Sequence, residues 1–154
     1  MADPKRAEDS GRPARDTSVA DTRRPGAPLS GNESARRVVV LGASRRPESY
    51  SNRAVRRLLE QGFEVIPVHP LYEEVEGIPA LRSLGEVRGP VDTLTVYVGP
   101  RNLEPLIEDI VKLRPGRVVL NPGTESQALE ARLRAAGISY VEDCTLVMLA
   151  GGGF

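Results

Sequence analysis

The chain has 154 residues, 21 basic and 21 acidic side chains and one histidine, so its formal net charge is zero. A neutral chain of this size predicts one folded unit that its overall charge does not draw to nucleic acid or to an anionic membrane. The single cysteine excludes an internal disulfide and a zinc site built from several thiolates.

The first 34 residues differ in composition from the rest of the chain. They are rich in Pro, Gly, Ser, Asp and Arg, and their only large aliphatic side chains are Met1, Val19 and Leu29. Because such a segment buries too little apolar surface to offset its conformational entropy, we expect a disordered tail at 1–34 and a folded domain at 35–154. The charged start has no apolar stretch typical of a secretory signal, and no segment is apolar enough for a transmembrane helix. These features predict a cytoplasmic protein.

The folded domain begins with an apolar run followed by helical spacing. Val38–Leu41 is continuous and β-branched, as expected for a strand that is buried on both faces. The next segment repeats its apolar residues at helical spacing, with Ser49 or Ser51 as the N-cap and Gly62 as the stop.

A second strand is predicted at 63–68, and Pro67 indicates that it lies at a sheet edge because proline cannot donate to a ladder. A weak helix is expected at 80–87. Val91–Val98 predicts a third strand.

The remaining segments continue the alternation. A helical stripe at 103–111 precedes a buried strand at 118–120. A helix capped by Thr124 and ended by Gly137 then leads to a last strand at 138–141. Strands that alternate with helices predict an α/β protein with a doubly wound, mostly parallel sheet and helices on both faces.

Four short turns follow the strands of this predicted sheet. Because the carboxyl ends of parallel strands share one edge, the turns are expected to form a binding rim. The first turn leaves room for a phosphate at Gly42, and free N–H groups at the following helix start would face a pyrophosphate. Arg45 and Arg46 add positive charge. The four turns are "GASRR" (42–46), "HP" (69–70), "VGP" (98–100) and "NPG" (121–123).

A nicotinamide or flavin dinucleotide is the first ligand to consider, and two observations argue against it. The turn reads Gly-Ala-Ser and not G-x-G-x-x-G. The second strand ends in His69-Pro70, where a free ribose diol requires Asp or Glu. NADP is the better dinucleotide candidate, because Arg45 and Arg46 suit a 2′-phosphate.

Four segments carry a family resemblance. They are "VVVLGASRRPESYSNRAVRRLLEQGFEVIPVHP", "VDTLTVYVGP", "VVLNPGTES" and "DCTLVML", and together they cover nearly all of 36–149. In this order they resemble the CoA-binding-domain proteins, which are single Rossmann-like domains similar to the N-terminal part of the succinyl-CoA synthetase α subunit. His69-Pro70 departs from the Asn-Pro that is common in the family.

The resemblance implies that coenzyme A (CoA) or an acyl-CoA binds along the rim. It places the diphosphate on the first turn and the start of the first helix, the adenosine beside the second strand end, and the adenosine or pantetheine path along the third and fourth turns. The implied residues, in that order, are Gly42, Ala43, Ser44, Arg45, Ser51 and Asn52; Val68 and Pro70; and Tyr97, Val98, Pro100, Asn121, Pro122 and Gly123.

The sequence offers little for catalysis. His69 fits a turn or core position better than a general base, and Cys144 fits a buried packing position better than a thiol that meets the thiol of CoA. Neither a G-x-S-x-G nucleophile elbow nor a metal-ligand spacing is present.

We therefore expect a CoA-binding module that is non-catalytic or regulatory on its own. The alternatives are a small NADP-linked oxidoreductase and the CoA-holding component of a multi-subunit acyl-CoA ligase. A regulatory protein whose tail contacts a partner is a further alternative. Whether the chain binds a protein partner or a second copy of itself is left open. Neither nucleic acid nor a membrane is expected as a partner.

Overall fold

The computed structural model describes residues 36–154, and the tail predicted at 1–34 lies outside the described residues. The chain divides into two compact units. The described residues of one unit are Arg36 and Leu58–Glu64. The other unit comprises Arg37–Arg57 and Val65–Phe154.

The smaller unit contains the end of the first helix. The N–H of Phe63 donates to the Leu58 carbonyl (3.1 Å), and the N–H of Gly62 donates to the Leu59 carbonyl (3.1 Å). This pair of bonds is a Schellman motif, which confirms the predicted stop at Gly62. The Arg36 guanidinium lies 4.8 Å from the centre of the Phe63 ring.

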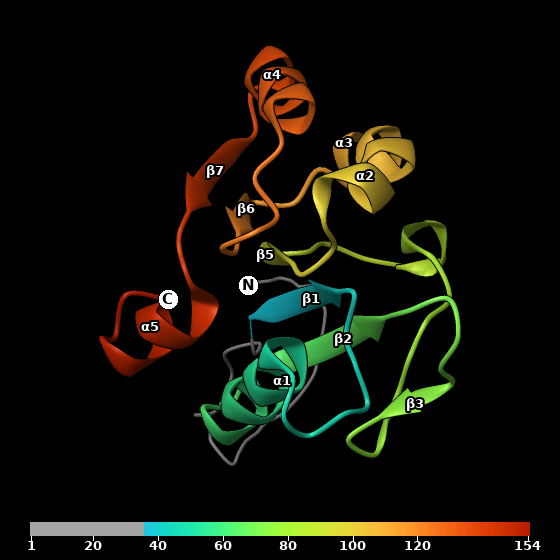
Figure 1. The fold of residues 1–154 in the computed structure, drawn as a ribbon, viewed down its shortest axis with the longest axis vertical. Helices are drawn as coiled ribbons and strands as arrows, with labels where there is room; N and C mark the ends of the chain where they lie inside the picture. The colour runs from blue at the N-terminus through green and yellow to red at the C-terminus, as the bar shows by residue number, and fades with distance from the viewer. Residues whose placement is uncertain (1–35) are drawn as a thin grey trace, which may run out of the picture. The chain divides into compact units, whose positions relative to one another are not determined.

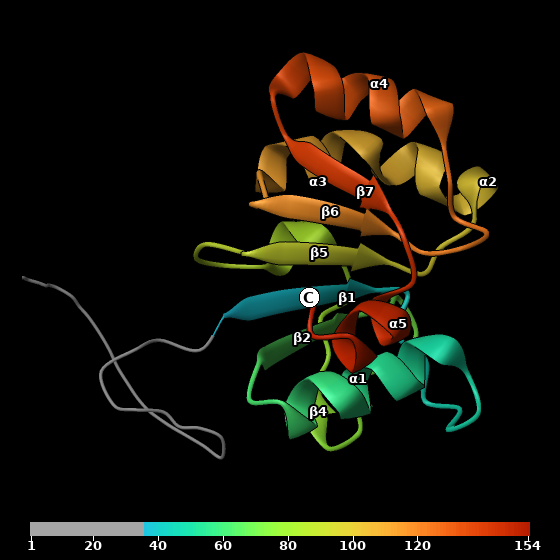
Figure 2. The ribbon, with the colours of Figure 1, turned by 90° about the vertical axis from the view of Figure 1, so that its left-hand side faces the viewer.

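A five-stranded sheet with strand order β2-β1-β5-β6-β7 organises the fold. The pairs β1–β5, β5–β6 and β6–β7 are parallel, so the predicted parallel sheet is confirmed (Figure 2). Pro67 lies in edge strand β2, as predicted. The strands are β1 (Arg37–Leu41), β2 (Glu64–Val68), β5 (Thr93–Val96), β6 (Arg117–Leu120) and β7 (Ser139–Glu142).

Helices cover both faces of the sheet in the larger unit (Figure 1). α5 and the part of α1 up to Arg57 lie on one side, whereas α2, α3 and α4 lie on the other. The helices are α1 (Tyr50–Glu60), η1 (Leu84–Glu86), α2 (Pro100–Leu103), η2 (Glu104–Leu106), α3 (Ile107–Leu113), α4 (Gln127–Ala136) and α5 (Thr145–Ala150).

The core explains why the strands are rich in apolar residues. One face of the sheet packs its buried side chains against those of α2, α3 and α4, which removes apolar surface from water and stabilises the layered arrangement. The contributing residues include Leu94, Val96, Val118 and Leu120 from the strands and Leu103, Ile110, Leu129 and Leu133 from the helices.

Two local predictions are wrong. The helix expected at 80–87 is reduced to the single turn η1, and an antiparallel hairpin of β3 (Glu74–Val75) and β4 (Ile78–Pro79) precedes it. The cap of α4 is Ser126, whose Oγ accepts the Leu129 N–H, and not Thr124. The helical stripe predicted at 103–111 is confirmed, and its middle turn is the 3₁₀ turn η2, because Pro105 has no N–H for a continuous α-helix.

Candidate functional site

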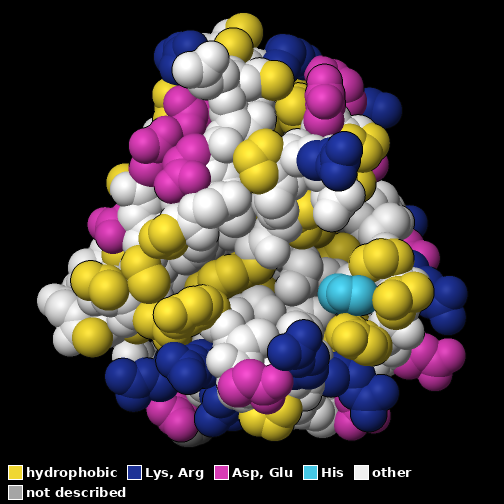
Figure 3. Space-filling view, viewed as in Figure 1, with side chains coloured by type: hydrophobic (Ala, Val, Ile, Leu, Met, Phe, Trp, Pro, Cys, Tyr) yellow, Lys and Arg dark blue, Asp and Glu magenta, His cyan; other side chains and the backbone are white. Residues whose placement is uncertain are grey.

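The parallel strands bring the predicted turns to one rim. The turn after β1 and the turns after β5 and β6 follow the carboxyl ends of neighbouring strands. Figure 3 views this rim face-on: basic side chains gather in its lower part, over α1 and the turn before it, and acidic side chains gather at the upper left. The lower part therefore favours an anionic ligand.

Gly42 is required by its contacts within the protein. Its φ is +89°, a left-handed conformation that side-chain-bearing residues rarely adopt. A Cβ there would lie 2.8 Å from Val98 Cγ2 and 3.1 Å from the Tyr97 carbonyl oxygen. The prediction that Gly42 leaves space for a phosphate therefore needs correction, because Tyr97 and Val98 occupy the space that a side chain would need.

Four backbone N–H groups of the first turn are bonded within the protein, whereas the free N–H groups were predicted at the start of the following helix. Gly42 N and Ala43 N donate to the Val68 carbonyl (2.9 and 3.3 Å). Ser44 N donates to Ser51 Oγ (3.0 Å), and Arg46 N donates to Ser44 Oγ (3.0 Å). The fifth backbone N–H of the turn, that of Arg45, has no hydrogen-bond acceptor within residues 36–154.

Two serines hold the start of α1 in different ways. Ser49 is the N-cap, since its Oγ accepts the Asn52 N–H (3.1 Å), and it also donates to the Arg46 carbonyl (2.8 Å). Ser51 was the other predicted cap. It is buried, and its Oγ accepts a hydrogen bond from the Ser44 N–H. The helix start and the turn are thus one hydrogen-bonded unit.

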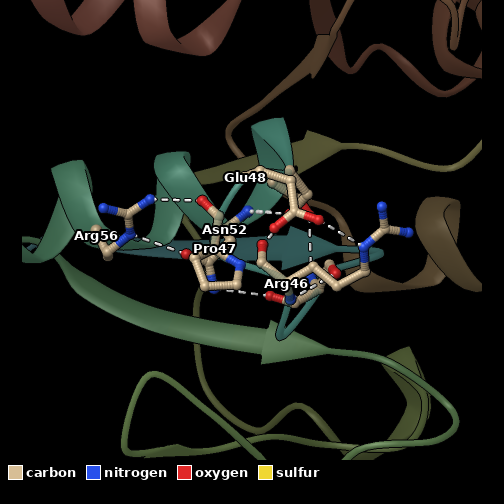
Figure 4. A network of polar contacts seen from close by, with 8 residues as sticks. Arg46, Pro47, Glu48, Asn52 and Arg56 are labelled. Atoms are coloured by element: carbon tan, nitrogen blue, oxygen red, sulfur yellow. Dashed lines mark hydrogen bonds and ion pairs between the residues drawn. The ribbon is translucent and has the colours of Figure 1, made fainter.

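Asn52 is the centre of the polar network in Figure 4. Its fully buried side chain donates from Nδ2 to the Ser44 carbonyl (2.9 Å) and to Glu76 Oε2 (2.9 Å), and its Oδ1 accepts from Arg56 Nε (2.8 Å). Arg56 also donates to the Pro47 carbonyl (2.7 Å). Asn52 was predicted to lie near a ligand, and the structure places it as the residue that positions the turn.

The hairpin that sequence reasoning missed contributes to this network. Glu76 and Gly77 both have positive φ (53° and 77°), as in a two-residue type I′ turn. From this turn, the Glu76 carboxylate accepts the hydrogen bond from Asn52 Nδ2. The signal in the sequence was Glu-Gly between the apolar residues Val75 and Ile78.

His69, Tyr72 and Arg45 meet beside the end of β2. The His69 and Tyr72 rings are stacked, with centroids 4.2 Å apart, and the Arg45 guanidinium lies 5.7 Å from the centre of the Tyr72 ring. His69 Nδ1 accepts the Leu71 N–H (3.1 Å), so the prediction of a turn histidine is confirmed. Burial lowers the pKa of His69 below its ordinary value, which favours the neutral ring that this bond requires.

The end of β5 contributes a phenol that does not titrate near neutrality. Burial raises the pKa of Tyr97 to about 12. Thr95 and Thr145 lie close enough to offset part of this rise, but their hydroxyl groups bond each other (2.7 Å). Among the described residues, Tyr97 Oη is buried without a hydrogen-bond partner. Tyr97 therefore keeps its proton at pH 7 and is neither an acid nor a base there.

Asn121, after β6, is buried and bonded inside the protein. Its Nδ2 donates to Thr95 Oγ1 (2.7 Å) and the Val96 carbonyl (2.8 Å), and its Oδ1 accepts the Thr145 N–H (2.8 Å). This side chain links three elements. Other predicted residues of the third and fourth turns, Pro100, Pro122 and Gly123, are exposed on the rim, and Val98 is half-buried.

An open groove of about 400 Å³ lies farther along the rim. It follows the starts of α2 and α4, and of the predicted site residues it includes Pro100. The first turn, where the basic side chains lie, is not part of it. Its lining residues are Pro100, Arg101, Glu104, Glu125, Ser126, Gln127 and Ala128.

Cys144 lies at the start of α5, directly after β7 ends. It was predicted to be a buried packing residue, and the structure shows it half-buried. Its N–H donates to Asp143 Oδ1 (2.7 Å). Among residues 36–154, no group of three or more His, Cys, Asp or Glu side chains is arranged to hold a metal ion. No helix in this range is long and apolar enough to cross a membrane.

Comparison with known proteins identifies the family of the chain. The family model for the CoA binding domain matches residues 36–150. The chain is 32% identical over 78 residues to YneT of Bacillus subtilis (strain 168), which covers 51% of this chain and 58% of YneT. It is 36% identical over 91 residues to the acetate–CoA ligase [ADP-forming] II subunit alpha of Pyrococcus furiosus. This aligned region covers 57% of this chain and 20% of that subunit.

A solved structure agrees with these sequence matches. A Thermus thermophilus protein superposes with a TM-score of 0.72 at 35% identity, and the match covers 78% of this chain and 91% of that one. The match to the CoA binding domain spans the strands, the first turn and α5, and therefore includes the whole rim. The chain belongs to the CoA-binding-domain family.

Proposed function

We propose that this protein binds CoA or an acyl-CoA at the rim, with the diphosphate against the turn Gly42–Arg46, and that the chain alone performs no chemistry on it. The observation that carries the proposal is the composition of this turn within a CoA-binding-domain fold. Arg45 and Arg46 are exposed beside the Arg45 N–H, and Arg46 is paired with Glu48 (3.1 Å). An anion placed there therefore meets one backbone donor and the Arg45 guanidinium.

The predicted residues divide into two roles under this proposal. We assign to shaping the rim the residues that are buried, which are Asn52, Ser51, Ala43, Val68 and Asn121, and Gly42, which is confined by Tyr97 and Val98. Direct contact is left to residues whose atoms reach the surface. These are Ser44, Arg45, Pro70, Tyr97, Val98, Pro100, Pro122 and Gly123.

A second candidate is the CoA-holding component of an acyl-CoA ligase. The similarity to the Pyrococcus furiosus acetate–CoA ligase subunit favours it. The chain spans one fifth of that subunit, so the ligase activity would need groups from elsewhere. Both candidates share the CoA site. The chain alone should form no acetyl-CoA from acetate, CoA and ATP under either candidate. They differ in whether acetyl-CoA forms when the chain is mixed with the other parts of such a ligase.

Calorimetric titration tests the proposed ligand. We expect CoA to bind about tenfold or more tightly than NAD, because the end of β2 lacks the carboxylate that a free ribose diol requires. NADP carries a 2′-phosphate in place of that diol and is the closer competitor, and we expect CoA to bind more tightly than NADP because the fold is that of the CoA binding domain. The same protein sample titrated with each ligand at equal ionic strength is the internal control. Equal or tighter binding of NADP would favour the oxidoreductase alternative and contradict the proposal.

A further inference from the structure

The contact between Arg45 and the aromatic rings after β2 was not part of the predicted site. Arg45 is exposed, and Tyr72 and His69 are each half-buried, so all three present atoms to solvent on the rim. Tyr72 lies 27 positions from Arg45 in the sequence, and the fold places the guanidinium 5.7 Å from its ring centre. In open parallel sheets, the end of the second strand is where the ribose of a bound nucleotide is recognised.

The other basic groups near the turn are already engaged. Arg46 Nε bonds Glu48 Oε2 at 3.1 Å. Arg56 is held by Asn52 and the Pro47 carbonyl. Within residues 36–154, Arg45 makes a ring contact and no ion pair, so its charge is free to meet an anionic ligand.

The contact of the Arg45 guanidinium with the Tyr72 ring is weak enough for a phosphate contact to replace it. A cation over an exposed aromatic ring contributes less free energy than a charge-assisted hydrogen bond to a phosphate. Tyr72 thus keeps the guanidinium near the end of β2 until a phosphate replaces the ring. The His69 ring is neutral when its Nδ1 accepts the Leu71 N–H, and its hydrogen then lies on Nε2, which can donate to the ligand.

We propose that Arg45, Tyr72 and His69 recognise the phosphorylated ribose and the base of the ligand, and that they distinguish it from the unphosphorylated ribose. This inference rests on the proposed function, in which the ligand is CoA and the group is its 3′-phosphate. The same chemistry occurs in the 2′-phosphate of NADP. Arg45 supplies the charge, whereas the Tyr72 and His69 rings offer flat surface to the base.

The experiment titrates the full chain with CoA and with 3′-dephospho-CoA, and in parallel with NADP and NAD. Each pair differs by one ribose phosphate. We expect CoA to bind about tenfold to a hundredfold more tightly than dephospho-CoA, the range of one charge-assisted contact. Arg45→Gln should abolish this preference, so that CoA and dephospho-CoA bind equally. Any loss of dephospho-CoA affinity in this variant measures the contact of the same side chain with the diphosphate, which both ligands carry. Tyr72→Leu should weaken both CoA forms by similar factors, because both carry the same base.

Arg82→Gln is the matched control. It removes one exposed positive charge that pairs with Glu73 (3.8 Å), so it should leave the preference for CoA over dephospho-CoA intact. Thermal melts of each variant establish that the fold is retained. Equal binding of CoA and dephospho-CoA by the unaltered chain, or a preference that survives Arg45→Gln, overturns the inference while CoA binding stands. Failure of both CoA forms to bind contradicts the proposed function itself. A preference for NADP over NAD that depends on Arg45 would then assign the phosphorylated ribose to NADP.

Discussion

Replacing Gly42 with alanine is expected to lower the melting temperature by roughly 10 °C or more. The left-handed φ of +89° costs a residue with a Cβ about 1–2 kcal/mol. The overlap with Val98 Cγ2 and the Tyr97 carbonyl adds about 1–3 kcal/mol, because a backbone oxygen cannot move aside as a flexible side chain does. For a domain of this size, 1 kcal/mol corresponds to roughly 4 °C.

Gly85→Ala is the matched control for this prediction. Gly85 has no left-handed φ, and the nearest atom to an added Cβ is Ser83 Oγ at 3.7 Å. The control should change the melting temperature by no more than roughly 2 °C. Both variants are compared with the unaltered chain by differential scanning calorimetry. A Gly42→Ala protein as stable as the control would show that β1 and β5 do not restrict the turn in this way.

Asn52→Ala is expected to have the second large effect, on both stability and CoA affinity. It removes hydrogen bonds to the Ser44 carbonyl, Glu76 and Arg56 from a fully buried position. Because these partners lose their hydrogen bonds, the free energy of unfolding should fall by about 2–4 kcal/mol. Affinity for CoA should fall by about tenfold, because the turn must then be ordered when the ligand binds. Urea unfolding and calorimetric titration measure the two effects.

Asn102→Ala provides the same chemical change at an exposed position on α2. It should leave unfolding free energy and affinity within about 0.5 kcal/mol of the unaltered chain. If Asn52→Ala lowers stability but leaves CoA affinity unchanged, the turn does not need this network to receive a ligand. The assignment of Asn52 as a positioning residue would then be wrong.

The sheet could be predicted from the sequence because its signals are local. Val38–Leu41 and 118–120 are continuous apolar runs, and helical spacing separates them, so alternation alone indicated parallel strands. Pro67 indicated the edge strand for a covalent reason, the missing N–H. These features depend on a few neighbouring residues, and tertiary contacts did not change them.

The placement of the turns was predictable, but their contacts were not. The turns after the strands were predicted to share one rim, and the parallel strands bring them there. However, the partners of Gly42 are Tyr97 and Val98, more than 50 positions away, and no sequence pattern records such a contact. Tyr72 and Glu76 were missed because the segment after β2 was read as a connection to a weak helix. The hairpin that carries Glu76 has strands of two residues each, too short for a clear alternation.

The most direct test is a crystal structure of the chain grown with saturating CoA. We expect the diphosphate within hydrogen-bond distance of Ser44 or Arg45 at the first turn, with the adenosine beside Tyr72 and His69. The contacts that position the turn, from Asn52 to Ser44 and Glu76, should be unchanged. CoA bound instead in the groove between α2 and α4, with the turn Gly42–Arg46 empty, would contradict the proposed site.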